Sequence, residues 1–105
     1  MAPVTNEAIK VIKQFLDLAA GAGFNIEKAI LFGSYAKGAA DRWSDMDLAL
    51  VSPDFTGIRF NDRKALIPLL LKTDARIEVH PFKPDTFTRN DFFVAEILDH
   101  GINLI

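Results

Sequence analysis

The sequence predicts one α/β domain, in which a small mixed β-sheet is flanked by helices. The 105 residues are enough for a single hydrophobic core. Hydrophobic residues make up 50% of the chain and charged residues 25%, as in ordinary globular proteins. Segments with helical and strand-like hydrophobic spacing alternate, and no repeat, low-complexity tract or linker separates them. We therefore expect a single domain that covers residues 1–105.

The first predicted element is an amphipathic helix within residues 5–23. Thr5 is suited to cap its N-terminus, and Gly21 or Gly23 is suited to end it. The apolar side chains of this segment recur at helical spacing, at Ile9, Ile12, Leu16 and Ala19.

Two strands are predicted next. Residues 29–32 form a short apolar run that Gly33 ends, which predicts a central strand buried on both faces. A helical turn is expected from Ser34, because serine after a glycine that ends a strand is a good N-cap. The second strand spans residues 45–51, where alternation along a strand puts the aspartates at its first and third positions on one face.

A helix and a third strand follow. The helix is predicted over residues 61–70, capped by Asn61 or Asp62 and kinked or divided at Pro68. Residues 76–80 alternate polar and apolar side chains, which predicts a strand that the following proline ends.

The last predicted helix spans residues 88–100. Thr88 or Asn90 is suited to cap it, Gly101 to stop it, and a short strand over residues 102–105 closes the sheet. Its candidate core residues are Phe93, Ile97 and Leu98.

Charge and composition limit the classes of partner. The formal net charge is −2 and the pI is near 5.6, so there is no global basic field to hold nucleic acid or an anionic membrane surface. Cysteine is absent, no secretory signal is recognisable, and no apolar run approaches the roughly 20 residues that span a bilayer. We expect a cytoplasmic protein that contacts neither membrane nor nucleic acid directly, and whose polyanionic ligand is small or held through metal.

Acidic side chains on one strand face are costly unless a positive charge lies between them. Asp45 and Asp47 repel each other unless one is protonated or a hard divalent cation such as Mg²⁺ bridges them. Mg²⁺ also takes phosphate oxygens and water as ligands, which fits a nucleotide site. Gly33 lets the backbone approach a phosphate closely, and the Ser34 hydroxyl and the amides that follow offer donors. Glu78 adds a third carboxylate on the polar face of the third strand.

These residues form a motif that resembles the one in the DNA polymerase β-like nucleotidyltransferase superfamily. A Gly-Ser pair is followed after ten residues by Asp-x-Asp. The short chain and the acidic strand after residue 75 further resemble the minimal nucleotidyltransferase branch, the MntA-like antitoxins encoded beside HEPN-domain toxins. The matching positions are Gly33-Ser34, Gly38, Ser44-Asp45 and Asp47-Leu48.

The resemblance implies a two-metal Mg²⁺ site in which Asp45, Asp47 and Glu78 are both the metal ligands and the catalytic carboxylates. Glu78 stands where aspartate is commoner, and its longer side chain still reaches a metal if the strand lies slightly farther back. ATP is the implied substrate. The residues that would bind the nucleotide are Gly33, Ser34, Lys37 and Ser44, with Arg42 as a further cation.

The resemblance also implies a reaction and a partner. AMP would pass from ATP to a tyrosine hydroxyl of a cognate HEPN toxin, so the protein would be an antitoxin that acts by AMPylation and forms a hetero-oligomer with the toxin. A catalytically silent antitoxin that neutralises the toxin by binding alone is an alternative. A stand-alone enzyme for a small hydroxyl compound is a third, which we favour less because the chain has no room for an acceptor-binding lobe.

Several other side chains have more than one interpretation. His80 shares a strand face with Glu78 and is a base, a support for the metal ligands, or a structural residue. Tyr35 either stacks on a nucleotide base or packs in the interior. We expect Trp43 to cover the core and the phenylalanines within residues 82–93 to lie mostly in it.

Overall fold

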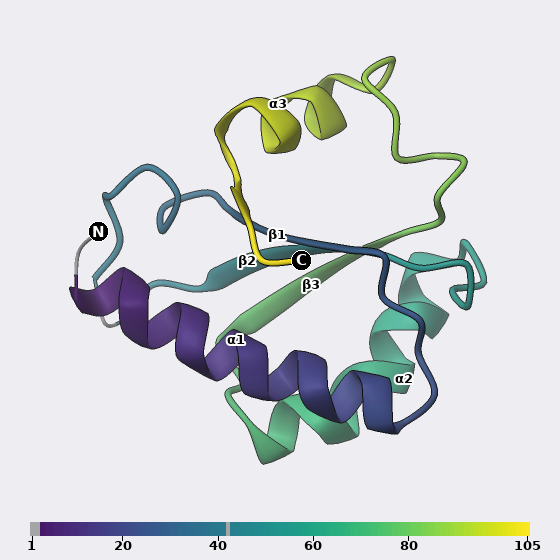
Figure 1. The fold of residues 1–105 in the computed structure, drawn as a ribbon, viewed down its shortest axis with the longest axis horizontal. Coiled ribbons are helices and arrows are strands. Elements are labelled where there is room, and N and C mark those ends of the chain that lie inside the picture. The colour runs from purple at the N-terminus through teal and green to yellow at the C-terminus, as the bar shows by residue number, and fades with distance from the viewer. Residues whose placement is uncertain (1–2, 42) are drawn as a thin grey trace.

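The computed structural model describes residues 3–41 and 43–105 and shows three layers (Figure 1). Within these residues a four-stranded sheet forms the middle layer. The helices α1 (Pro3–Gly21) and α2 (Arg59–Lys72) cover one face of the sheet, and α3 (Phe92–His100) covers the other (Figure 1). The predicted fold class, a small mixed sheet flanked by helices, is confirmed. None of the helices in the described segments has the length and apolar content needed to cross a bilayer.

The sheet has the strand order β3-β2-β1-β4. β2 pairs with β3 in parallel and with β1 antiparallel, and β4 pairs antiparallel with the other side of β1. This puts β1 and β2 in the interior of the sheet and leaves β3 at an edge. The strands are β1 (Lys28–Phe32), β2 (Met46–Val51), β3 (Ile77–Phe82) and β4 (Ile102–Asn103).

The two inner strands bury side chains on both faces, as the apolar run at residues 29–32 predicts. On the face toward α1 and α2, Leu31 and Leu48 belong to the larger apolar cluster. On the face toward α3, Ile30 and Ala49 join Val94 in the smaller cluster. Alternation along β2 therefore puts residue 47, two positions before Ala49, on the α3 face of the sheet.

α1 begins earlier than predicted but ends as expected. Thr5 is buried inside the helix and does not cap it, because the helix already starts at Pro3. At the other end the amide of Phe24 donates to the carbonyl of Ala19, and Gly23 has a φ of +97°. This is the geometry in which a glycine terminates a helix.

α2 also starts before the predicted cap. Ile58 is the N-cap and offers no side-chain bond. Asp62 lies in the first turn, where its buried carboxylate accepts hydrogen bonds from Thr56 and Gly57 in the preceding loop. The helix continues through Pro68 in one piece, so the predicted division there is wrong. Packing of the buried face of α2 outweighs the local cost of the proline.

α3 is shorter than predicted, and the residues on its buried face are not all the predicted ones. Asp91 is the N-cap and accepts from the amides of Phe93 and Val94, so neither predicted cap is used. Val94 and Ile97 are buried, whereas Phe93 is 43% exposed. The helix stops at Gly101, where a Cβ would collide with a methyl group of Ile30 on β1.

The expectations for Trp43, for Phe92 and for the ends of β3 and β4 are wrong. Trp43 is 80% exposed and Phe92 is 92% exposed, so neither belongs to the core. β3 runs past Pro81 to Phe82, which an edge strand tolerates because one side of its backbone needs no ladder bond. β4 ends at Asn103, two residues before the predicted end.

Candidate functional site

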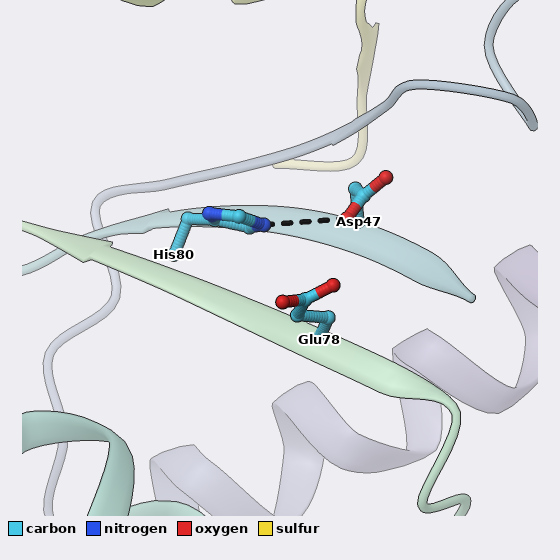
Figure 2. A group of neighbouring side chains, drawn as sticks. All are labelled: Asp47, Glu78 and His80. Carbon is cyan, nitrogen blue, oxygen red and sulfur yellow. Dashed lines mark hydrogen bonds and ion pairs between the residues drawn. The ribbon is translucent and has the colours of Figure 1, made fainter. Parts of the chain in front are cut away.

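Asp47 on β2 and Glu78 on β3 are direct neighbours across the sheet. The parallel register pairs Asp47 with Glu78, and two residues further on it pairs Ala49 with His80. Because side chains of one strand alternate between faces, Asp47, Glu78 and His80 project from the same face (Figure 2). One ligand atom of each of these three residues lies within 4.8 Å of the other two. The fold therefore joins two of the three predicted carboxylates and adds a histidine to them.

Gly33 packs against the carboxylate of Asp47. β1 pairs with β2 so that Phe32 faces Asp47, and the chain turns away at the next residue. A Cβ at Gly33 would lie 2.5 Å from Oδ2 of Asp47, and Gly33 has a φ of +74°. Glycine is therefore required at this position both by the backbone conformation and by the close approach.

This arrangement fits a hard divalent cation. Two carboxylates so close together on one face favour a bound cation, since each raises the cost of charge on the other. Carboxylate oxygens are the ligands that Mg²⁺ prefers. Asp47 and Glu78 are only partly buried, so water and a ligand's oxygens have access to complete the coordination.

His80 connects the carboxylate pair to α2. Its Nε2 lies 3.3 Å from Oδ1 of Asp47, and its Nδ1 lies 2.9 Å from Nη2 of Arg59. Burial lowers the pKa of His80; the hydrogen bond to Asp47 opposes this, and the positive charge of Arg59 lowers it further. The lowered pKa favours the neutral ring at pH 7.

Two phenylalanine rings pack against the ring of His80. Phe32 and Phe93 lie with their ring centroids 4.9 Å and 5.8 Å from that of His80, both in edge-to-face orientation. The two phenylalanines are themselves 5.5 Å apart. These contacts from β1 and α3 limit rotation of the imidazole.

Asp45 lies outside this group. It precedes β2 and is exposed, and the pairing with β3 begins only where the amide of Met46 donates to the carbonyl of Arg76 at 2.8 Å. The alternation that predicts a face shared with Asp47 holds only inside a strand. A part for Asp45 in metal binding stays a prediction.

The turn after β1 carries Ser34 and Lys37. The amide of Lys37 donates to the carbonyl of Gly33 at 3.1 Å, and the amide of Ala39 donates to that of Ser34 at 3.0 Å. Gly38, with a φ of +72°, ends this single helical turn. Ser34 and Lys37 are both exposed, and their contact with a nucleotide stays a prediction.

A small hollow opens between this turn and α3. It measures about 160 Å³ and adjoins Gly33, so it borders the same turn that packs on Asp47. Lys37 lines one side, and Phe93 and Glu96 line the other. This volume is below the roughly 300–1,000 Å³ of a typical small-molecule pocket.

Ser44 and Tyr35 hold the loop between β1 and β2. Ser44 Oγ accepts from the amide of Asp41 at 3.1 Å, and the Tyr35 hydroxyl reaches the carbonyls of Asp41 and Ser44 at 3.2 Å and 3.3 Å. Tyr35 is buried, which raises its pKa, so of its two interpretations the structure shows packing. Nucleotide binding by Ser44 stays a prediction, and Arg42 lies outside the described residues.

Arg59 was not predicted from the sequence. It is the first residue of α2, 21 positions before His80, and no motif links the two. Only the packing of α2 beside the edge strand β3 brings them together. The polar face of the third strand did indicate His80 as a neighbour of Glu78.

The fold is that of a nucleotidyltransferase. The sequence profile described as a nucleotidyltransferase domain matches residues 8–104, so the chain belongs to that family. The crystal structure of a candidate nucleotidyltransferase from Sulfolobus solfataricus superposes with a TM-score of 0.68 and 17% sequence identity. The match covers 95% of this chain and 81% of that one, and at this identity it concerns the fold alone. None of the curated proteins matches the chain significantly.

Proposed function

We propose that the protein transfers AMP from ATP to a hydroxyl group, and that the acceptor is a tyrosine of a cognate HEPN-domain toxin. Membership of the nucleotidyltransferase family supports nucleotide transfer. The observation that carries the proposal is the pairing of Asp47 and Glu78 on neighbouring strands beside Gly33. The resemblance of the motif to that of the MntA-like antitoxins supports the choice of acceptor.

In this function Asp47 and Glu78 would hold the divalent ion, with Asp45 as the expected further ligand. A Mg²⁺ ion bound there would offset the charge of the triphosphate and stabilise the charge that develops during phosphoryl transfer. Gly33 lets the chain approach the triphosphate, because it has no side chain to obstruct it. The hydroxyl of Ser34 and the ammonium of Lys37 supply a donor and a positive charge from the same turn.

The transfer forms one bond and breaks one. The acceptor oxygen bonds to the α-phosphorus, the bond from that phosphorus to the oxygen bridging the β-phosphate breaks, and pyrophosphate leaves. The acceptor's proton passes to a carboxylate, and we assign this role to Glu78. The product is an AMP ester of the acceptor.

The proposal is tested by incubating the protein with Mg²⁺, α-labelled ATP and the HEPN-domain protein encoded by the neighbouring gene. We expect label on the partner with the native chain, and a loss of about a thousandfold or more with Asp47→Asn, since removing one key electrostatic group costs roughly that much. Asp17→Asn is the matched control, because Asp17 is exposed on α1 across the sheet from the site. Replacing the labelled tyrosine of the partner by phenylalanine must abolish labelling.

Two other results would each overturn the proposal. Tight binding of the partner without label transfer would make the protein a catalytically silent antitoxin. Label transfer to a small hydroxyl compound with no protein partner would make it a stand-alone enzyme. The Asp45→Asn variant, assayed in parallel, tests whether the exposed aspartate completes the carboxylate set.

A further inference from the structure

The hydrogen bonds of His80 fix which of its ring nitrogens carries the proton. The guanidinium of Arg59 has only donors, so Nδ1 of His80, at 2.9 Å from Nη2, must accept. A neutral imidazole with an accepting Nδ1 carries its proton on Nε2. Nε2 therefore donates to Oδ1 of Asp47, at 3.3 Å, in the contact that Figure 2 marks with a dashed line.

This protonation pattern has a consequence for metal binding. A histidine coordinates a metal through a nitrogen lone pair, and in this arrangement Nε2, the nitrogen that faces the carboxylates, has none to offer. His80 lies within 4.8 Å of the ligand oxygens of Asp47 and Glu78, close enough to be taken for a third metal ligand. The hydrogen bond from Arg59 therefore excludes His80 as a metal ligand.

The same bonds define how Asp47 is oriented. Oδ1 is turned toward His80, and Oδ2 lies on the side of Gly33, 2.5 Å from where a Cβ of that residue would be. The His80 side chain is only 12% exposed and is held edge-on by Phe32 and Phe93. The fixed Nε2–H group of His80 therefore fixes the rotation of the Asp47 carboxylate, with Oδ2 directed at the turn after β1.

We propose that His80 is a positioning residue for Asp47 and not a metal ligand, and that Arg59 acts through it by fixing its tautomer. An oxygen-only site suits Mg²⁺ and Mn²⁺, whereas a site with an imidazole ligand suits Zn²⁺ and other transition metals. The inference rests on the proposed metal site, but its tests need no nucleotide transfer.

The first test is spectroscopic. Long-range ¹H–¹⁵N correlation spectra of the ¹⁵N-labelled protein at pH 8 distinguish the two neutral tautomers of His80, and the His100→Gln variant assigns the signals. We expect the Nε2–H tautomer in the metal-free protein, and the same tautomer after saturation with Mg²⁺. An Nδ1–H tautomer in either state, or a doubly protonated ring, would overturn the inference.

The second test measures Mn²⁺ affinity by calorimetry, with no nucleotide present. His80→Ala is expected to weaken binding about tenfold or more, in the range found for groups that orient metal ligands. In His80→Gln the side-chain amide can still donate to Oδ1, so we expect most of the affinity to return. No loss of affinity in His80→Ala would contradict the positioning role. A failure of AMP transfer alone would leave both tests intact.

The part assigned to Arg59 is tested by whether its replacement weakens or strengthens Mn²⁺ binding. If Arg59 acted only through its charge, Arg59→Met would strengthen cation binding, because a nearby positive charge is removed. Positioning predicts the opposite, a several-fold weaker binding of Mn²⁺ and a mixture of His80 tautomers. Arg63→Met is the matched control, since it removes the same charge one helical turn further along α2 and is expected to change neither. Unchanged or tighter binding in Arg59→Met would overturn the part assigned to Arg59.

Discussion

Gly33 combines two constraints, and its substitution is a direct test of the site. We expect Gly33→Ala to weaken Mn²⁺ binding at least tenfold, because the new Cβ would lie 2.5 Å from Oδ2 of Asp47 and the carboxylate must turn away. Alanine at a φ of +74° also costs about 1 kcal/mol of stability. Calorimetric titration with Mn²⁺ and urea unfolding measure the two effects separately.

Gly38→Ala is the control that separates them. Gly38 has nearly the same φ, +72°, but a Cβ there would meet no heavy atom within 4 Å. We expect a similar loss of stability, again about 1 kcal/mol, with metal affinity unchanged. Equal losses of affinity in both variants would show that strain in the turn, and not the contact with Asp47, controls the site.

Part of the site follows from single residues in the sequence. Asp47 and Glu78 could be predicted as neighbours because Asp47 is acidic in an apolar strand and Glu78 lies on the polar face of the third strand, and the fold puts them in register. Asp45 is separated from them because β2 begins at Met46, one residue after Asp45. Arg59 could not be found, because only the packing of α2 beside β3 brings it to His80.

At the level of elements, Asp62 controls how α2 begins. Its buried carboxylate accepts from the Thr56 amide at 2.7 Å, the Thr56 hydroxyl at 2.9 Å and the Gly57 amide at 3.1 Å. We expect Asp62→Ala to lower the free energy of unfolding by roughly 2–3 kcal/mol, since hydrogen bonds to a charged group are lost and their donors are left open. Urea unfolding at pH 7 checks this.

The neighbouring Asn61→Ala is the comparison for this change. Asn61 is exposed at the adjacent position of the same helical turn, so a shift within about 0.5 kcal/mol is expected. If both variants lose the same stability, the contribution of Asp62 is helix propensity and not attachment of the loop.

An ion pair just before β3 makes a contribution to the free energy of unfolding that depends on pH. Asp74 accepts hydrogen bonds from the side chain and the amide of Arg76, and these hold the pKa of Asp74 below its usual value. A carboxyl whose pKa is lower in the folded state stabilises above its unfolded pKa, and this stabilisation is lost as pH falls through the folded value. Asp74→Asn should therefore cost about 0.5–1 kcal/mol at pH 7, discounted for the exposure of the pair.

Urea unfolding at pH 7, 5 and 3 tests this dependence. The difference between Asp74→Asn and the native chain must shrink as the pH approaches 3, because asparagine retains the bond from the Arg76 amide and lacks only the charge. Asp85→Asn, an exposed carboxylate in the loop after β3, serves as the control. A difference that does not vary with pH would mean that packing of the side chain is responsible.

The boundaries of elements are where sequence reasoning was least accurate. Ile58 occupies the N-cap of α2 without a side-chain bond although Asn61 and Asp62 follow closely, and Asp91 caps α3 in place of the predicted Thr88 or Asn90. Hydrophobic spacing predicted the first helix and the strands, whereas the second helix was predicted mainly from its capping residues and turn signals. Burial of an apolar face contributes most to the stability of a helix in a protein. Caps contribute about 1 kcal/mol each, so packing of the whole element overrides them.

At the scale of the whole molecule, the sheet separates two functions. The face toward α1 and α2 holds the larger apolar cluster, whereas the face toward α3 holds the smaller cluster and the acidic pair. The smaller cluster leaves the strand ends beside Gly33 open, and this is where the carboxylates lie. Stability is therefore concentrated on one face, and the other can carry two like charges.

This division predicts that the acidic pair lowers stability until a cation binds. In a metal-free buffer with chelator, Asp47→Asn should be as stable as the native chain or more stable, by a gain on the order of 1 kcal/mol, since one of two close charges is removed. Asparagine retains an Oδ1 to accept from Nε2 of His80, so that bond is preserved.

Addition of Mg²⁺ should invert the order. At one hundred times its dissociation constant the ion stabilises the native chain by about 2.7 kcal/mol, which for a domain of this size raises the melting temperature by roughly 10 °C. Asp47→Asn should show no such rise, whereas Asp17→Asn should follow the native chain in both buffers. Calorimetric melting with chelator and with Mg²⁺ gives all the values. Equal shifts of the melting temperature in the native chain and in Asp47→Asn would place the bound ion elsewhere. Only a cation held between Asp47 and Glu78 makes Mg²⁺ change which of the two proteins is the more stable.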